Sequence, residues 1–442
     1  MTRKVYTDVA AFKEQNAAYK TALPFAESTR ILRAPLTVGT VEIQNRLACQ
    51  AMEGCDGTTA GAPDVLTHRR YRRFAAGGAG LIWFEATAVL PEGRANPRQL
   101  YICDGTLDTF KRLVEEIKET GLRENGVAPT VIMQATHSGR YSKPNGKPEP
   151  LIAYNNPLFE GDKPIDAARI LTDDALDRVG EALVHGAVLA EKAGFDGVDI
   201  KCCHRYLNSE LLSAYTRKGK YGGSLENRTR LLRESVQGTM QATGANFLVT
   251  SRLNVYDGFA YPYGFGVAKD GTLAFDPTEP IWLLETLAAC GVQLLNITMG
   301  NPYFNPHVNR PFANGPYTAD EHPLCGVARV LHGTATLKAA VPRIKLVCSA
   351  LSFLGVAAPH VAAAFIENGG FDIAGFGRTA FAYPDFANDI LKTGEMQGGK
   401  CCIACSKCTA LMRAGGTPGC IIRDKEVYLP LYRQLCTGEE GI

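Results

Sequence analysis

The stretch DDALDRVGEALVHGAVLAEKAGFDGVDIKCC, residues 173–203, contains one full unit of the pattern that decides the fold. Residues 173–194 begin with two acidic residues, continue with helical periodicity and end in a glycine, which predicts a helix. Residues 197–203 form a short, mainly apolar run, which predicts a buried strand. The stretch therefore predicts a helix–strand unit of an α/β protein.

Short apolar runs of the same kind recur along the chain and alternate with longer helical segments. We expect eight strands, near residues 47–50, 81–86, 130–136, 197–203, 247–253, 294–299, 344–350 and 373–378. Eight such units predict a (β/α)8 TIM barrel, whose active site lies where the carboxyl ends of the strands meet the following loops. A doubly wound open sheet is the alternative. It would be favoured by a GxGxxG motif after the first strand, but GGAG at residues 77–80 precedes a strand.

Around the barrel we expect two appendages. The predicted segments are an N-terminal helical extension at residues 1–30, the barrel at residues 31–394, and a glycine- and cysteine-rich segment at residues 395–442. The first thirty residues lack the apolar stretch of a signal peptide or membrane span, so a cytoplasmic protein is expected. The 47 basic and 45 acidic residues contain no basic block, which argues against nucleic-acid binding.

The last fifty residues carry a cysteine motif, CCIACSKCTALMRAGGTPGC at residues 401–420. Cys402, Cys405 and Cys408 follow one another at x2 gaps, and Cys420 comes after eleven more residues. Four thiolates suit iron–sulfur or zinc, and this spacing favours a [4Fe-4S] cluster over the paired CxxC knuckles of zinc sites. Zinc and unliganded thiols are the alternatives. Cys401 is adjacent to this set, but Cys402 gives the CxxC register.

Six barrel segments together resemble a known family. They are QNRLACQAMEG (44–54), GLIWFEATAVLPEGR (80–94), VIMQATHSGR (131–140), GFDGVDIKCCHRYL (194–207), YGGSLENRTRLLRE (221–234) and FGRTAFAYPDF (376–386). The chain resembles the Old Yellow Enzyme superfamily of FMN barrels over residues 30 to 425. The cysteine motif points to its iron–sulfur branch, which contains 2,4-dienoyl-CoA reductase, enoate reductase and trimethylamine dehydrogenase.

The resemblance implies a set of FMN contacts. The residues that would contact the flavin ring are Ala51, Met52, Glu53, Ala86, Gln134 and Arg252. Glu53 would tune the flavin potential and cannot form the covalent flavin bond that a cysteine forms in trimethylamine dehydrogenase. Arg252 would stabilise the anionic reduced flavin.

The phosphate of FMN would lie at the seventh and eighth strand ends. Backbone donors from Ser349 and Ala350 and the side chain of Arg378, after Gly377, would bind it. The family usually has two glycines in place of Ser349 and Ala350, a mild departure because the phosphate needs only the backbone amides.

The fourth strand ends in the residues that the resemblance makes catalytic. Tyr206 would donate a proton, while His204 and Lys201 would bind the substrate oxygen. Lys201 departs from the residue usual in the family. The loop after the sixth strand, MGNPYFNPHVNRPF (299–312), adds Tyr303 and His307 as candidate substrate contacts.

These features predict an ene-reductase that uses FMN and a [4Fe-4S] cluster on an α,β-unsaturated carbonyl or carboxyl compound. The alternatives are an amine dehydrogenase of the trimethylamine dehydrogenase type and an electron-transfer flavoprotein subunit. We expect the chain to lack the relatives' C-terminal FAD and NAD(P) domains. Electrons are therefore expected either from NAD(P)H directly or from a separate redox protein or FAD/NAD(P)H subunit. A homo-oligomer is expected.

Overall fold

Eight parallel strands form a closed barrel in the computed structural model, which describes residues 3–438. The strand order around the barrel is β10-β3-β4-β5-β6-β7-β8-β9. The strands are β3 (Leu47–Cys49), β4 (Leu81–Ala88), β5 (Thr130–Thr136), β6 (Gly197–Ile200), β7 (Leu248–Asn254), β8 (Leu294–Thr298), β9 (Lys345–Cys348) and β10 (Ile373–Phe376). The predicted (β/α)8 barrel is confirmed.

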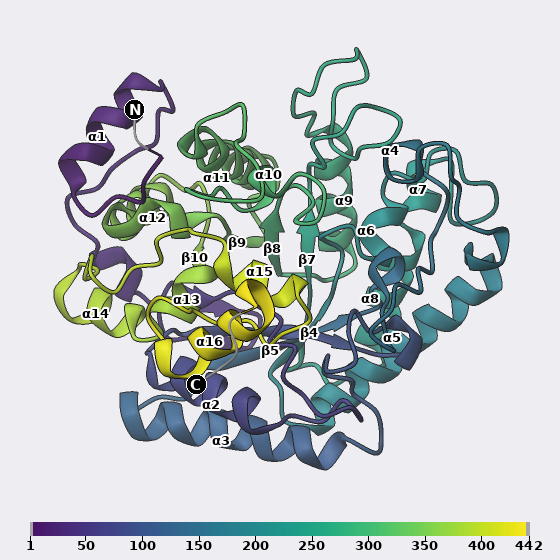
Figure 1. The fold of residues 1–442 in the computed structure, drawn as a ribbon, viewed down its shortest axis with the longest axis horizontal. Coiled ribbons are helices and arrows are strands. Elements are labelled where there is room, and N and C mark those ends of the chain that lie inside the picture. The colour runs from purple at the N-terminus through teal and green to yellow at the C-terminus, as the bar shows by residue number, and fades with distance from the viewer. Residues whose placement is uncertain (1–2, 439–442) are drawn as a thin grey trace.

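Helices surround the barrel, and short helices also lie in the segments that connect its strands (Figure 1). They are α1 (Val9–Ala18), α2 (Val65–Ala76), α3 (Leu107–Asn125), α4 (Pro157–Glu160), α5 (Asp173–Lys192), α6 (Leu207–Leu211), α7 (Leu225–Arg228), α8 (Arg230–Ala242), α9 (Thr278–Ala289), α10 (Pro306–Asn309), α11 (Pro323–Ala340), α12 (Ala358–Glu367), α13 (Arg378–Ala382), α14 (Phe386–Thr393), α15 (Lys407–Arg413) and α16 (Lys425–Tyr432). No helix within residues 3–438 is long and apolar enough to span a membrane.

Three predicted strands extend two or three residues too far at their carboxyl ends, and left-handed or irregular backbone explains each difference. β6 ends before the consecutive positive φ angles of His204 (63°) and Arg205 (61°). β9 ends before Ala350, whose φ is 71°. β10 ends where Gly377 turns the chain into α13. In a TIM barrel these strand ends form the active-site face, so the irregular backbone lies where loops present functional groups.

A hairpin that the sequence did not predict covers the opposite end of the barrel. It consists of β1 (Leu36–Val38) and β2 (Val41–Ile43), which pair antiparallel. Its apolar residues Leu36, Val38 and Ile43 belong to the same buried cluster as residues of the barrel strands, such as Trp83. The hairpin therefore seals the amino-terminal end of the barrel and leaves the carboxyl ends as the open face.

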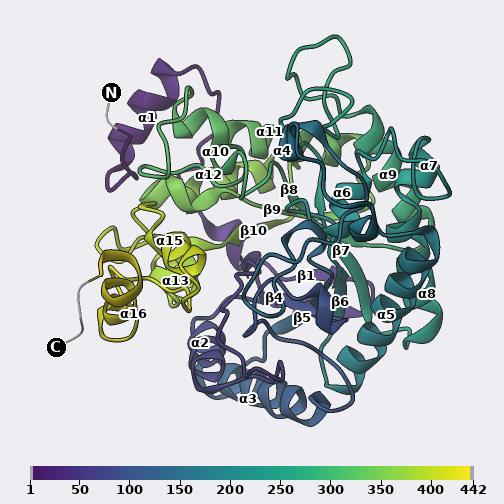
Figure 2. The same cartoon turned by 45° about the vertical axis from the view of Figure 1, so that its right-hand side comes forward.

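The cysteine-rich segment folds back onto the barrel. In Figures 1 and 2, α15 and α16 lie beside α13 and near α2. Asp424, just before α16, forms ion pairs with Arg69 and Arg73 of α2, and only 7% of Asp424 is exposed. The backbone N–H groups of Ala313 and Asn314 also donate to the carbonyl of Ala404. These contacts hold the cysteines against the face where the strands end.

Candidate active site

A cavity of about 150 Å³ lies at the carboxyl ends of the strands. Its lining contains twelve of the fifteen residues proposed from the sequence for flavin binding, substrate binding or catalysis: Ala51, Met52, Glu53, Gln134, Lys201, His204, Arg252, Tyr303, Ser349, Ala350, Gly377 and Arg378. These residues come from strands and loops spread over more than 300 positions of the chain. Barrel closure therefore brings them to one site.

The other three of these fifteen residues do not line this cavity. Ala86 is 1% exposed within β4, and its carbonyl accepts a hydrogen bond from Gln99. His307 points elsewhere, because its Nδ1 lies 2.5 Å from the hydroxyl of Tyr317. Tyr206 is buried behind the wall, but it contacts two residues that do line the cavity.

Glu53 connects the lysine and the tyrosine of the predicted catalytic set. Its Oε1 lies 3.2 Å from Lys201 Nζ and accepts a hydrogen bond of 2.9 Å from the Tyr206 hydroxyl. The Tyr206 hydroxyl also lies 3.0 Å from that of Tyr303. Burial, followed by the charge of Glu53, raises the pKa of Tyr206 well above its usual value. Tyr206 is therefore protonated at neutral pH.

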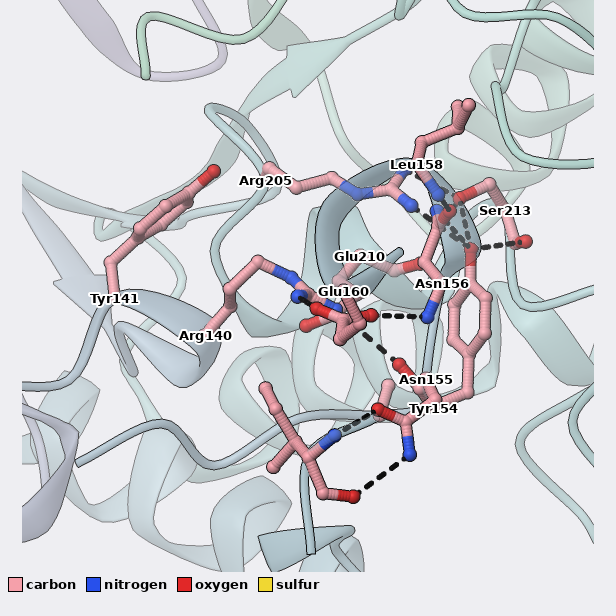
Figure 3. Close-up of polar contacts among 12 residues, drawn as sticks. Arg140, Tyr141, Tyr154, Asn155, Asn156, Leu158, Glu160, Arg205, Glu210 and Ser213 are labelled. Atoms are coloured by element: carbon pink, nitrogen blue, oxygen red, sulfur yellow. Dashed lines mark hydrogen bonds and ion pairs between the residues drawn. The ribbon is translucent and has the colours of Figure 1, made fainter. Parts of the chain in front are cut away.

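His204 is positioned by its neighbour Arg205. The guanidinium of Arg205 donates to Ser213 Oγ (2.5 Å), to Asp257 Oδ2 (3.0 Å) and to the Tyr154 hydroxyl (2.9 Å). Figure 3 shows this side chain extending toward Tyr154 and Ser213. Because Arg205 is anchored in this way, the strained turn is held and His204 faces the cavity.

The imidazole of His204 is neutral. Burial, followed by the charges of Arg252, Lys201 and Arg310, lowers its pKa well below the usual value. Its Nε2 is buried and has no hydrogen-bond partner among the residues that the structure describes. A neutral imidazole on a cavity wall can donate to a carbonyl oxygen.

A second buried network supports the same wall. Arg140 forms ion pairs with Glu160 and with Glu210, the latter at 2.5 Å (Figure 3). The adjacent Tyr141 stacks on Tyr303 with ring centroids 3.9 Å apart. The network thus fixes the position of Tyr303. None of these charged residues was singled out from the sequence, because their pairing depends on contacts between distant loops.

Another part of the cavity lining is organised around Asp199, which is buried in β6. Asp199 accepts hydrogen bonds from Gln134 Nε2 (2.6 Å), Trp83 Nε1 (2.7 Å) and the backbone N–H of Arg252 (2.6 Å). These bonds orient Gln134 and Arg252 toward the cavity. The Nε of Arg252 is buried and unpartnered within residues 3–438. A fixed cation and an amide on one wall suit the polar edge of a flavin.

The ends of β9 and β10 form the third wall, where the phosphate was expected. Arg378 is 6% exposed, and its Nη2 donates to the carbonyl of Pro311 at 2.6 Å. Arg310 and Arg413, which the sequence analysis missed, line the same cavity. Among the described residues, Nη1 of Arg378 and Nη2 of Arg310 have no partner. Buried donors without partners fit an anionic group such as the phosphate of FMN.

The four cysteines of the predicted cluster gather around a second cavity. Cys402, Cys405, Cys408 and Cys420 all line it, and Cys401 does as well. The backbone N–H of Ala404 lies 3.3 Å from Cys402 Sγ. No group of three or more His, Cys, Asp or Glu side chains among the described residues is arranged to hold a metal ion.

The two cavities adjoin each other. Cys408, Arg378 and Phe381 line both. The pKa of Cys402 is raised to about 12, chiefly by burial; Arg378 lowers it, while Cys408 and Cys420 raise it. The thiols and Arg378 thus line one cavity.

The sequence of the barrel matches a known protein family. Residues 32–270 match the NADH:flavin oxidoreductase / NADH oxidase family, and the chain belongs to that family.

The chain is also similar in sequence to individual known proteins. It is 32% identical to an NADPH dehydrogenase of Bacillus pumilus over 275 residues, which are 61% of this chain and 73% of that protein. It is 40% identical to an NADPH dehydrogenase of Halalkalibacterium halodurans over 177 residues, which are 39% of this chain and 48% of that protein.

Among solved structures, a 2-naphthoyl-CoA reductase complex superposes with a TM-score of 0.71 at 21% identity. The superposition covers 89% of this chain and 57% of that one, and it supports the fold alone. The chain thus spans about half the length of some of the proteins that it matches.

Proposed function

We propose that this chain is an ene-reductase that binds FMN and a [4Fe-4S] cluster and reduces an α,β-unsaturated carbonyl or carboxyl compound. The observation that carries the proposal is the arrangement of Tyr206 and His204. His204 lines the cavity, and Tyr206 lies behind the cavity wall in contact with the lining residues Glu53 and Tyr303. Tyr206 is a protonated acid, and His204 is a neutral donor with its Nε2 unpartnered within the described residues. Conjugate reduction needs one group of each kind.

FMN, when bound, would supply a hydride to the β-carbon of the alkene. The residues of the chain would supply the rest of the chemistry. His204 donates a hydrogen bond to the substrate oxygen, where negative charge develops. Tyr206 donates its hydroxyl proton to the α-carbon, and solvent returns a proton to it. The hydride and the proton together complete the two-electron reduction of the C=C bond.

The ion pair of Lys201 with Glu53 changes the role proposed for the lysine. Lys201 Nζ lies 3.6 Å from the centroid of the Tyr206 ring and 3.2 Å from Glu53. Because Lys201 already forms an ion pair, it is better suited to orienting Tyr206 and Glu53 than to binding a substrate oxygen. The same lysine opposes amine oxidation, because it occupies the aromatic face that a substrate ammonium would need.

NAD(P)H and the cluster would supply electrons by two different routes. The relatives named NADPH dehydrogenase support direct reduction by a nicotinamide nucleotide. The shared lining residue Cys408 supports electron exchange between the cluster and the flavin, because it lies on both cavities. A separate redox protein is the partner expected for the second route.

Stopped-flow mixing of the reduced protein with a panel of enones and enoates tests the proposal. We expect at least one alkene to reoxidise the flavin under anaerobic conditions. The same panel should include a methylated amine mixed with the oxidised protein. If only the amine changes the flavin spectrum, or if only a redox protein reoxidises it, the ene-reductase proposal is wrong.

A further inference from the structure

The helix α15 of the cysteine-rich segment borders both cavities. Cys408, near its amino-terminal end, lines the two of them, whereas Thr409, Met412 and Arg413 line the active-site cavity alone. The cysteine-rich segment therefore carries more than the proposed cluster ligands, because its helix also forms part of the wall of the space in which a substrate would react.

Arg413, the last residue of this helix, contacts the loop that holds the proposed acid in place. Its Nη2 donates to the carbonyl of Pro302 at 3.0 Å. The next residue of that loop is Tyr303, whose hydroxyl lies 3.0 Å from the hydroxyl of Tyr206. Arg413 is exposed although it lines the cavity. Its guanidinium therefore lies at the mouth of the cavity, on the side of Tyr303.

The lining of this cavity has an excess of positive charge. Glu53 is its one acidic residue within the part of the chain that the structure describes, and Glu53 is already paired with Lys201. The cationic lining residues are Lys201, Arg252, Arg310, Arg378 and Arg413. Four arginines thus remain without an acidic partner in the lining.

Arg413 differs from the other three arginines. Arg252, Arg310 and Arg378 each have a buried side-chain nitrogen without a partner within residues 3–438, and these nitrogens suit the polar edge and the phosphate of FMN. Arg413 is exposed, and its acceptor is an uncharged carbonyl. No carboxylate among the described residues forms an ion pair with it. Bound FMN would therefore leave Arg413 as a cation available to a second ligand.

We propose that Arg413 is a specificity-determining residue, which binds a carboxylate at the outer end of the unsaturated substrate. This inference rests on the proposed function and narrows its substrate class to compounds that carry a carboxylate in addition to the conjugated carbonyl. His204 would bind the carbonyl oxygen, and Arg413 would bind the carboxylate at the mouth. A guanidinium that gives one N–H to a carbonyl keeps further donors for a carboxylate.

The surroundings of Arg413 also indicate what would join the two polar groups of the substrate. Met412 precedes it in the chain, and Pro302 is in contact with it. Both residues line the cavity. An apolar lining beside the guanidinium suits a hydrocarbon linker between the alkene and the carboxylate.

A matched pair of enones tests the proposal. 7-Oxooct-5-enoate and its primary amide share the alkene, the ketone and the saturated chain, and they differ in the charge at the far end. Each would be mixed anaerobically with the reduced full-length holoprotein, and flavin reoxidation followed by stopped flow over a range of concentrations. We expect the carboxylate to bind about 10-fold more tightly than the amide, with a similar limiting rate. Homologues with shorter and longer chains would find the best linker length.

Replacing Arg413 should remove this preference. We expect Arg413→Gln to weaken binding of the carboxylate about 10-fold and to leave both the amide affinity and the limiting rate within about twofold, since a uniform binding contact is lost. Arg413→Lys, which keeps the charge, should restore part of the preference. Titration of the oxidised flavin absorbance with each enone gives the same affinities without turnover.

Lys407→Gln is the matched control. Lys407 is an exposed cation at the other end of α15, and it lines the cysteine cavity but not the active-site cavity. Its removal changes the charge of the helix by the same amount as Arg413→Gln. We expect the ratio of the carboxylate and amide affinities to stay at the wild-type value.

Several outcomes would overturn the role of Arg413. Equal affinity for carboxylate and amide across the wild-type series is one, and an equal loss of both in Arg413→Gln is another. Weaker FMN binding with an unchanged ratio would assign Arg413 to the cofactor, and slower reduction by NADPH alone would assign it to the nucleotide. If no alkene reoxidises the flavin, the proposed function fails together with this inference. If carboxylate and amide react alike, this inference alone fails.

Discussion

The hydroxyl of Tyr206 donates a hydrogen bond to Oε1 of Glu53 across 2.9 Å. The proposed proton donor is therefore held by a carboxylate that is itself paired with Lys201. A carboxylate acceptor keeps the phenol protonated and fixes its rotamer. The acid is thus oriented before substrate enters, by two residues that follow different strands, β3 and β6.

Replacing Tyr206 by Phe should slow reoxidation of the flavin by an alkene but not reduction of the flavin. Removing a general acid slows proton transfer by about 10²- to 10⁴-fold, so reoxidation of the reduced flavin by an alkene should slow by this factor. Reduction of the flavin should remain within about twofold of wild type, as measured by stopped-flow absorbance. Tyr303→Phe is the control that keeps Tyr206 in place. An equal loss in both half-reactions of Tyr206→Phe would contradict its role as an acid.

Replacing Glu53 by Gln should destabilise the fold. Only 1% of the Lys201 side chain is exposed, so the variant leaves a buried ammonium without its carboxylate. Breaking a buried pair by removing one partner costs about 3 kcal/mol or more. We expect this loss in the free energy of unfolding, measured by urea titration of the flavin-free chain. The double variant with Lys201→Met should recover most of the loss, and a further loss there would contradict the pairing.

The proposed set of cluster ligands predicts that replacing Cys420 and replacing Cys401 have different effects on the cluster. Wild-type protein purified anaerobically should contain about four iron and four sulfide per chain. Cys420→Ser should lose the cluster absorbance, because it removes a proposed ligand. Cys401→Ser should retain it, although Cys401 lines the same cavity, because the x2 spacing begins at Cys402. Zinc in place of iron, or cluster loss in the Cys401 variant alone, would revise the ligand set.

His137 should make stability depend on pH. Burial lowers its pKa to about 4 from an ordinary value of 6.5, and the neutral ring accepts a hydrogen bond from the N–H of Gly139 at 3.1 Å. Between these two values the unfolded chain binds the proton more readily, so stability falls as the pH drops from about 6.5 to about 4. The loss is about 3 kcal/mol in total.

His137→Gln, which retains an acceptor, should lack this component. The difference between the unfolding free energies of the variant and the wild type should therefore change across pH 4 to 6.5 and be constant above pH 7. A difference that does not vary with pH would show that the ring is not held neutral.

Much of the barrel and part of the site could be predicted from the sequence. Strand positions were recognisable because buried parallel strands read as continuous apolar runs, as in β5 and β8. The hairpin of β1 and β2 was missed because its two strands have only three residues each. Arg310 was missed because nothing in its local sequence distinguishes a guanidinium that faces a cavity from one that faces solvent.

By itself, the sequence determined the alternation of helices and strands, the spacing of the cysteines and the residue types at the strand ends. These features depend on local periodicity and on motifs, which are properties of neighbouring positions. Only the tertiary structure paired Glu53 with both Lys201 and Tyr206, and placed Arg310 beside Arg378. Such contacts join residues between 68 and about 150 positions apart, and they form only when the barrel closes and its loops meet on one face.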